Sequence, residues 1–190
     1  MSEAAVFDSF PTLATARLVL RQIRSADADA VYRLFADPAV TRYYDLATFD
    51  DPAQARELVA RFQQRFERRI GLRWGLALKT EPDALVGTCG YNIWVRPARR
   101  GLLGYDLVRA HWGRGLMTEA LTAVLDYGFH AMDLNRVEAL TFPANAASRR
   151  LLARLGFAEE GLLREYECYA DGPQDMAVYG LLRREWNACC

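Results

Sequence analysis

The sequence predicts a mixed α/β fold in which helices cover both faces of a central twisted sheet. Short apolar or alternating segments of strand length are interspersed with longer segments whose apolar residues recur every three or four positions. Gly, Pro and Asp mark the turns between these segments. Taken in order, the segments read βααβββαβαββ. That order implies a mixed sheet with helices on both faces.

The first part of the chain supplies one strand and two helices. A strand is expected near residues 17–23, followed by a helix over 26–36 that begins at Ser25, a natural N-cap. A second helical region should extend over about 52–69, because Asp51 can cap it and a proline suits its first turn.

Three strands are expected next, and they form the middle of the predicted order. Their approximate ranges are 73–79, 84–94 and 102–109. Turn residues at 81–83 and 97–101 separate them, because clusters of Pro, Asp and Gly favour turns over continued strand.

The last part of the chain supplies two helices and three strands. An amphipathic helix opens at Leu116, and a short alternating strand follows over 136–142. The next helix covers 146–155, with Asn145 as its N-cap and Gly156 as its C-terminal stop. A final hairpin completes the order.

The turn before the long helix is the most informative segment. An apolar run over 102–108 leads to a turn that holds Gly113 and Gly115, where the missing Cβ atoms allow a ligand to approach the backbone. The helix that follows has unpaired N–H groups and partial positive charge at its N-terminus. With Arg109 and Arg114 beside it, this corner predicts a site for a phosphorylated ligand.

Two common phosphate-binding motifs do not match this turn. The dinucleotide fingerprint needs a third glycine, where this chain has Met117 or Thr118, and a Walker loop needs Gly-Lys-Ser/Thr. The segment Trp112-Gly-Arg-Gly-Leu-Met117 instead resembles the pyrophosphate loop of the GNAT superfamily of acetyl-CoA-dependent N-acetyltransferases, usually Gln/Arg-x-x-Gly-x-Gly/Ala. Trp112 and Met117 depart from that pattern, and the resulting Trp-Gly-x-Gly-x-x-Thr-Glu-Ala resembles the RimJ/RimL-type branch.

Other segments resemble the same branch. Residues 145–157, Asn-x-x-Ser-x-Arg-Leu-Leu-x-x-Leu-Gly-Phe, are similar to the second half of the GNAT cofactor site. Residues 159–181 resemble the branch's last hairpin, and 15–38 its opening strand and first helix. The resemblance implies a GNAT-like fold and a single domain over residues 1–190, with a core at about 15–186.

The resemblance also implies acetyl-CoA as the cosubstrate. Backbone N–H groups from Gly113 to Met117 are expected at the phosphates, and a backbone N–H near Leu107 or Val108 at the developing oxyanion. The full set of expected cofactor-binding residues is Leu107, Val108, Arg109, Trp112, Gly113, Arg114, Gly115, Leu116, Met117 and Asn145.

Proton transfer needs an acid and a base. Alignment with the branch places Ser148 at its candidate acid, which protonates the leaving thiolate, and Glu167 at its candidate base, which deprotonates the amine. Strand alternation puts Glu165 on the same sheet face as Glu167, so Glu165 stays open as the base. A structural reading also stays open, in which Ser148 bonds only backbone or cofactor and Glu167 is a solvated strand carboxylate.

Other polar and aromatic residues are assigned more simply. His111 and His130 are expected to be structural, and Glu119 complements the helix dipole or contacts the cofactor loop. Three tyrosines are candidates to line the acceptor pocket: Tyr43, Tyr44 and Tyr91.

Composition bounds the class of protein. The 190 residues are 52% hydrophobic, which suits one sizeable core, and 24 basic residues balance 24 acidic ones. That balance argues against a nucleic-acid or membrane partner, and no apolar run reaches the roughly 20 residues of a spanning helix. The cysteines lack metal-ligand spacing, so no metal is expected. All four cysteines are instead expected to be free thiols in a reducing cytosol: Cys89, Cys168, Cys189 and Cys190.

The resulting hypothesis is a bacterial, cytoplasmic N-acetyltransferase, monomeric or homodimeric, that transfers acetyl by direct attack of a primary amine. The expected acceptor is the α-amine of a protein or peptide N-terminus. Two alternatives stay open: an acetyltransferase for a small amine, and a non-catalytic acyl-CoA-binding module.

Overall fold

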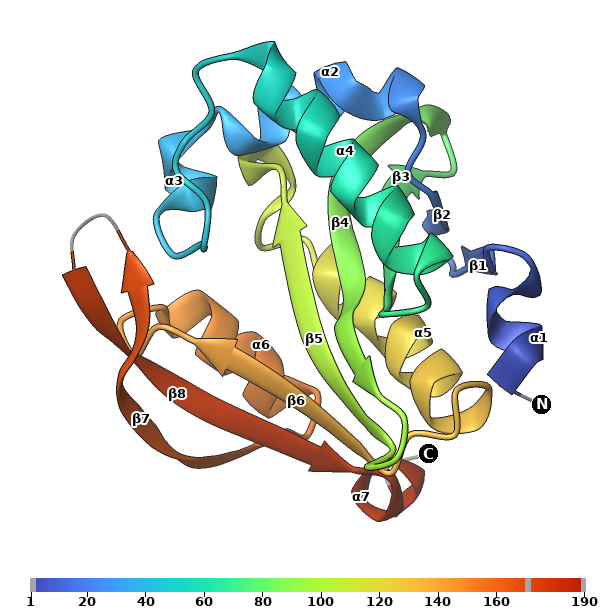
Figure 1. Cartoon of the computed structure of the whole chain (residues 1–190), viewed down its shortest axis with the longest axis vertical. Helices are drawn as coiled ribbons and strands as arrows, with labels where there is room; N and C mark the ends of the chain where they lie inside the picture. Colours follow the sequence, from blue (N-terminus) through green and yellow to red (C-terminus); the bar gives the residue numbers. More distant parts are fainter. Residues whose placement is uncertain (1–2, 170–171, 189–190) are drawn as a thin grey trace.

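In a computed structural model of the chain, residues 3–169 and 172–188 are described (Figure 1). The described residues form one eight-stranded sheet in the order β1-β2-β3-β4-β5-β6-β8-β7. The strands are β1 (Leu13–Ala14), β2 (Leu18–Gln22), β3 (Leu72–Leu78), β4 (Glu81–Val95), β5 (Arg100–Leu107), β6 (Arg136–Thr141), β7 (Ala158–Tyr169) and β8 (Gly172–Leu182).

Helices occupy the connections between these strands. They are α1 (Glu3–Asp8), α2 (Ala28–Phe35), α3 (Pro38–Thr41), α4 (Pro52–Glu67), α5 (Leu116–His130), α6 (Ala146–Arg154) and α7 (Arg183–Ala188), with short 3₁₀ turns at Ser25–Asp27 and Arg109–His111. The predicted order βααβββαβαββ is confirmed for the central elements. To it the structure adds α1, β1, α3 and α7, which are too short for periodicity to reveal.

Local signals explain where most elements begin and end. Asp51 caps α4 by accepting the Ala53 N–H at 2.8 Å, and Asn145 caps α6 by accepting the Ser148 N–H at 3.1 Å. Gly156 follows α6 in the left-handed region, at φ 87°. These features match the sequence predictions.

Two local predictions were wrong. Residues 81–83 were expected in a turn, but they lie in β4. Ser25 was expected to cap the first helix, but it begins a 3₁₀ turn, and the carboxylate of Asp27 closes the start of that turn by accepting the Arg24 N–H at 2.7 Å. Asp27 also binds the Arg21 guanidinium through both oxygens, at 2.8 and 2.9 Å.

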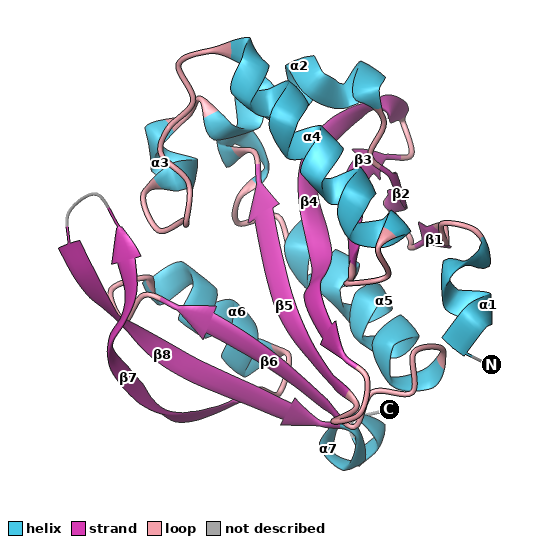
Figure 2. Cartoon of the chain, viewed as in Figure 1, coloured by secondary structure: helices cyan, strands magenta, loops and turns pink. Residues whose placement is uncertain are grey.

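The sheet separates two apolar cores (Figure 2). On one face, α2 and α4 pack around Phe35 and Phe62. On the other face, α5 and α6 pack around residues such as Leu121 and Leu152. Strands in the middle of the sheet are therefore covered on both faces, which explains why all residues of β3 except the last are buried.

The pairing of β5 with β6 ends early. These two strands are parallel, whereas the other strand neighbours of the described sheet are antiparallel. Their register runs from Arg100 opposite Arg136 to Leu103 opposite Ala139. Beyond that point both strands continue but diverge, and Figure 1 shows their C-terminal ends lying apart. Ligands of α/β sheets bind in such crevices at the carboxyl ends of strands.

In the described part of the chain, no helix has the length and apolar character needed to cross a membrane.

Candidate active site

Two cavities open where β5 and β6 diverge. The larger, the α5 cavity, has a volume of about 580 Å³ and is lined by the glycine turn, the start of α5 and one side of α6. The smaller, the α4 cavity, has a volume of about 250 Å³ and is lined by α4, β4, β6 and β7. Both cavities share a set of lining residues: Tyr43, Tyr44, Tyr105, Asn145 and Ser148. A ligand in one cavity would therefore meet a ligand in the other at these side chains.

The glycine turn forms one wall of the α5 cavity. Gly113 and Gly115 both have left-handed backbones, at φ 72° and φ 73°, which residues with a Cβ rarely adopt. A Cβ on Gly113 would meet no atom of the described residues within 4 Å, so the turn faces open space. Gly115 is the N-cap of α5, a helix of 15 residues whose N-terminus opens into the same cavity. This geometry suits a phosphate group.

Glu119 fixes the turn to the first strands of the sheet. One carboxylate oxygen accepts the Thr15 hydroxyl at 2.5 Å and the Arg17 N–H at 2.7 Å, while the other accepts Arg17 Nε at 2.6 Å. The Arg17 side chain also donates to the Arg114 carbonyl, at 2.9 Å. These donors lower the pKa of Glu119 although burial opposes them. Glu119 is therefore a link between the β1–β2 loop and the phosphate turn, in addition to complementing the helix dipole.

The C-terminal end of β5 presents one backbone amide to the opening. Leu107 lies opposite Gly87, and the next residue, Val108, donates its N–H to the Val86 carbonyl at 2.8 Å. In an antiparallel ladder this pattern makes Leu107 part of a non-hydrogen-bonded pair, so its N–H and C=O point away from β4. Its carbonyl accepts the Trp112 indole N–H at 2.7 Å. Its N–H therefore faces the side on which β6 has diverged.

A pair of hydroxyl groups lies where the two cavities meet. Tyr105 on β5 and Ser148 in the first turn of α6 are hydrogen-bonded at 2.7 Å between their oxygens. Burial raises the pKa of Tyr105 to about 12, against the effect of the Ser148 bond, so the phenol is neutral at physiological pH. Both hydroxyls can therefore donate a proton or a hydrogen bond to a group that enters from either cavity.

Comparison with known proteins identifies the family. Residues 17–158 match the family model described as the acetyltransferase (GNAT) domain. This chain belongs to the GNAT family. An uncharacterized N-acetyltransferase of Bacillus subtilis, YoaA, is 37% identical over 174 residues, which cover 92% of this chain and 98% of the relative. The chain is an N-acetyltransferase, and the mixed fold predicted for it is confirmed.

The relatives of this chain include ribosomal-protein N-acetyltransferases, the RimJ/RimL-like group. The [ribosomal protein uS5]-alanine N-acetyltransferase of Escherichia coli is 29% identical over 182 residues, which cover 92% of each chain. The solved structure of Mycobacterium smegmatis RimJ in complex with CoA-disulfide has the same fold, with a TM-score of 0.82 at 24% identity, covering 92% of this chain and 88% of that one.

The acetyltransferase brings together most of the residues expected at the cofactor. Seven of the ten line the α5 cavity: Leu107, Trp112, Gly113, Gly115, Leu116, Met117 and Asn145. Val108, Arg109 and Arg114 lie outside its lining. The Val108 N–H is used by the sheet, and Arg109 instead forms a 3.6 Å ion pair with Asp37.

Residues of α6 that sequence reasoning did not select also line the α5 cavity. Arg150 and Arg154 lie four residues apart, and so on one face of the helix. The sequence did carry a signal for them: the i, i+4 spacing of Arg150 and Arg154, beside Leu151, predicts that these side chains share one face of the amphipathic helix. His111 lines this cavity too, and its Nδ1 is buried without a hydrogen-bond partner among the described residues. His130 is exposed, and its Nδ1 bonds the Asp126 carbonyl at 2.9 Å.

The two carboxylates of β7 lie in different surroundings. Glu167 lines the α4 cavity, together with Ser148. Glu165 does not line it, because the strand register shifts between Leu163 and Glu167 and Glu165 has a left-handed backbone at φ 51°. The simple alternation that placed both carboxylates on one sheet face is therefore wrong at this bulge.

The three candidate tyrosines divide in the same way. Tyr43 and Tyr44 line both cavities. Tyr91 lies elsewhere: its side chain is fully buried, and its hydroxyl donates to the Val124 carbonyl of α5 at 2.9 Å. The expectation that Tyr91 lines the acceptor pocket is therefore corrected. The sequence around Tyr91 does not show whether its side chain lies in the core or lines a pocket.

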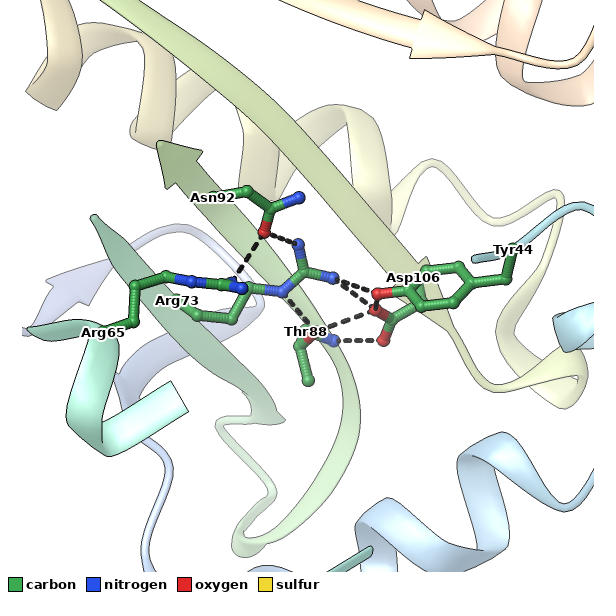
Figure 3. Close-up of polar contacts among 6 residues, drawn as sticks. All are labelled: Tyr44, Arg65, Arg73, Thr88, Asn92 and Asp106. Carbon is green, nitrogen blue, oxygen red and sulfur yellow. Dashed lines mark hydrogen bonds and ion pairs between the residues drawn. The ribbon is translucent and has the colours of Figure 1, made fainter. Parts of the chain in front are cut away.

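A buried polar network, drawn in Figure 3, lines the two cavities: it contributes Tyr44 to both, Asp106 to the α5 cavity and Asn92 to the α4 cavity. Arg73 on β3 forms a short, buried ion pair with Asp106 on β5. Asp106 also accepts the Thr88 N–H at 3.0 Å, the Thr88 hydroxyl at 2.9 Å and the Tyr44 hydroxyl at 3.3 Å. Burial raises the pKa of Asp106, and the Arg73 and Thr88 donors oppose that rise. Sequence reasoning missed this network, because its members are dispersed along the chain.

Two cysteines can be placed. Cys89 is buried and Cys168 exposed, and both are free thiols. Cys189 and Cys190 lie outside the described residues. Among residues 3–169 and 172–188, no cluster of His, Cys, Asp and Glu side chains has the arrangement of a metal site.

The Glu119 link predicts a pH-dependent stability. Glu119→Gln should lower the free energy of unfolding at pH 7 by roughly 1–2 kcal/mol, since charged hydrogen bonds are lost. Because the pKa of Glu119 is lower in the folded than in the unfolded state, its contribution is present above about pH 4.5 and is lost as pH falls through the folded pKa. Urea denaturation at pH 7 and at pH 3 checks this.

The matched control for that experiment is Glu57→Gln, at an exposed glutamate of α4. It should leave stability nearly unchanged at both pH values. A difference between wild type and Glu119→Gln that is as large at pH 3 as at pH 7 would contradict the role given to the carboxylate charge.

Proposed function

We propose that this acetyltransferase transfers the acetyl group of acetyl-CoA by direct attack to the α-amine of a protein or peptide N-terminus. One observation carries the proposal. The cavity at the glycine turn and the cavity at Glu167 meet at the Ser148 and Tyr105 hydroxyls, 2.7 Å apart. Donor and acceptor can therefore react without a covalent intermediate on the protein.

Acetyl-CoA is the cosubstrate, and the residues of the α5 cavity fit it. The left-handed turn at Gly113 and Gly115 offers N–H groups to a pyrophosphate, and the start of α5 adds partial positive charge. Arg150 and Arg154 supply cationic side chains to the same cavity. Acetyl-CoA contributes the thioester whose carbonyl carbon is attacked.

The protein's own groups would assist three events in the transfer. The amine nitrogen forms a bond to the carbonyl carbon, and the N–H of Leu107 would stabilise the charge that develops on oxygen. Glu167 would take the proton that the amine loses, directly or through a water. As the C–S bond breaks, Ser148 would protonate the thiolate. Tyr105 would hold the Ser148 hydroxyl in place and help to replace its proton.

The α-amine is the acceptor that best matches a carboxylate base. Its reference pKa is about 8, compared with about 10.4 for a lysine side chain, so far more of it is neutral at pH 7. The α4 cavity, at about 250 Å³, is below the usual range for a complete small-molecule site and suits the end of a peptide. The E. coli relative is named for acetylation of an alanine of ribosomal protein uS5, which supports the same class of acceptor.

If Glu167 is the base, substituting it should lower kcat far more than substituting its neighbour Glu165. Glu167→Gln should lower kcat by roughly 100-fold, because general-base assistance of this size is lost, while affinity for CoA is unchanged. Glu165→Gln, outside the cavity lining, is the matched control and should leave kcat within about twofold of wild type. Steady-state release of CoA measures both. A Glu165→Gln enzyme that is the slower of the two would place the base at Glu165 instead.

The nature of the acceptor is tested by locating the acetyl group. Peptides that carry both a free N-terminus and an internal lysine are incubated with acetyl-CoA and sequenced by mass spectrometry. We expect acetylation at the first residue and little at lysine. Acetylation chiefly on lysine, or activity confined to small amines, would overturn the peptide α-amine. Tight CoA binding without turnover of any amine would favour the non-catalytic module.

A further inference from the structure

The α4 cavity carries positive charge on one wall and negative charge on the other. Arg61 and Arg65 lie four residues apart on α4, so both face the cavity from the same side of that helix. Glu167 lines the cavity from β7, at the far edge of the sheet. A ligand that presents an amine toward Glu167 and an anionic group toward α4 would therefore complement both walls.

Arg65 is a cation held close to a second, fully buried cation. Its Nη1 donates to the Asn92 side-chain oxygen at 2.9 Å, and Arg73 Nη1 donates to the same oxygen at 3.2 Å (Figure 3). Because both Nη1 atoms bond the same oxygen, the two guanidinium groups lie close together. Asn92 reaches both because it lies at a register shift of β4, where a bulge redirects the side chain.

The negative charge inside this network balances only one of the two cations. Asp106 neutralises Arg73, whereas no carboxylate of the described residues lies within 4.0 Å of the Arg65 guanidinium. Asp45, an exposed residue of the cavity rim, attracts Arg65 from a distance, and the Phe62 ring lies 5.8 Å from its guanidinium carbon. Burial and the neighbouring Arg73 outweigh Asp45 and lower the pKa of Arg65.

A half-buried cation beside another cation is costly unless an anion joins it. Arg65 lines the cavity, so the missing anion can come from a ligand. A guanidinium is also the side chain best suited to bind a carboxylate through two parallel hydrogen bonds. A bound acceptor that brings a carboxylate to α4 would therefore balance the positive charge of Arg65.

We infer that the acceptor carries a carboxylate close to its reacting amine, and that Arg65, assisted by Arg61, binds this carboxylate while the amine lies at Ser148 and Glu167. The inference rests on the proposed function, and it specifies the acceptor class. Two kinds of molecule supply this chemistry: a peptide with an acidic side chain at its first or second residue, and a free amino acid with its own α-carboxylate.

Matched acceptors test the inference. The probes are hexapeptides with Asp at residue one or two, the same peptides with Asn there, and free alanine against alanine amide. Values of kcat/KM come from CoA release, and affinities come from calorimetry of each probe in the presence of CoA. We expect the acidic member of a pair to be favoured at least tenfold in both. A preference among peptides identifies the first source, and a preference confined to free alanine over its amide identifies the second.

Variants of α4 separate charge from structure. Arg65→Gln should remove the preference by weakening the acidic member alone, and Arg65→Lys should retain part of it. Arg56→Gln is the matched control, because Arg56 is an exposed arginine of α4 outside both cavities, and it should behave as wild type. Melting temperature and affinity for CoA serve as readouts that loss of carboxylate binding leaves unchanged.

Four outcomes are decisive. Turnover without preference for acidic members, or with preference for the amides, overturns the inference while the acetyltransferase proposal stands. Equal loss for both members in Arg65→Gln also overturns it, because Arg65 would then be structural. Selective binding of acidic probes that is lost in Arg65→Gln supports it even if no probe is acetylated, and that result would count against the proposed function. Equal binding of acidic and amide probes, with or without turnover, overturns it.

Discussion

The structure depends on the early end of the pairing between β5 and β6. A parallel pair that continued to Leu107 would close the sheet and leave no room for a ligand. Because the register stops at Leu103 opposite Ala139, the edge of β5 that faces β6 borders an opening beyond that point, while its other edge stays paired with β4. Both cavities, the Leu107 amide and the Tyr105 hydroxyl arise from this one divergence.

The buried network explains how β5 can leave β6 without losing its own position. Asp106, near the end of β5, is bound by Arg73 from β3 and Thr88 from β4, so the free end of the strand is held toward the antiparallel side of the sheet. A buried ion pair seldom adds much net stability, since desolvation offsets the attraction, but breaking one side of it is costly. Its value here is geometric. It fixes the strand whose end forms the floor of the site.

Much of the fold could be predicted from the sequence because its signals are local. The cap at Asn145, the stop at Gly156 and the left-handed turn at Gly113 and Gly115 each depend on a few adjacent residues. These same residues carry the family resemblance, so the cofactor side of the site could also be predicted from the sequence. Ser148 followed from its place in the α6 segment.

The acceptor side could not be predicted in this way, because it depends on contacts between distant segments. The side chain of Asn92 is directed by a bulge, and Glu165 is turned aside by another irregularity in β7. Tyr91 lies on β4 with its side chain in the core, whereas Tyr44 lies in the loop between α3 and α4. The sequence alone does not show which of the two tyrosines reaches the opening. The ion pair of Arg73 joins two strands 33 residues apart. Such features require the three-dimensional register.

The central claim is that donor and acceptor meet in the opening between β5 and β6. The most direct measurement is a crystal structure with a bisubstrate analogue, in which CoA is joined through an acetyl linker to the N-terminus of a peptide. The account predicts the pantetheine arm in the opening, the linker carbonyl within hydrogen-bond distance of the Leu107 N–H, and the peptide nitrogen between Ser148 and Glu167. An analogue bound with its arm outside the opening, or with its peptide directed away from the α4 cavity, would contradict it.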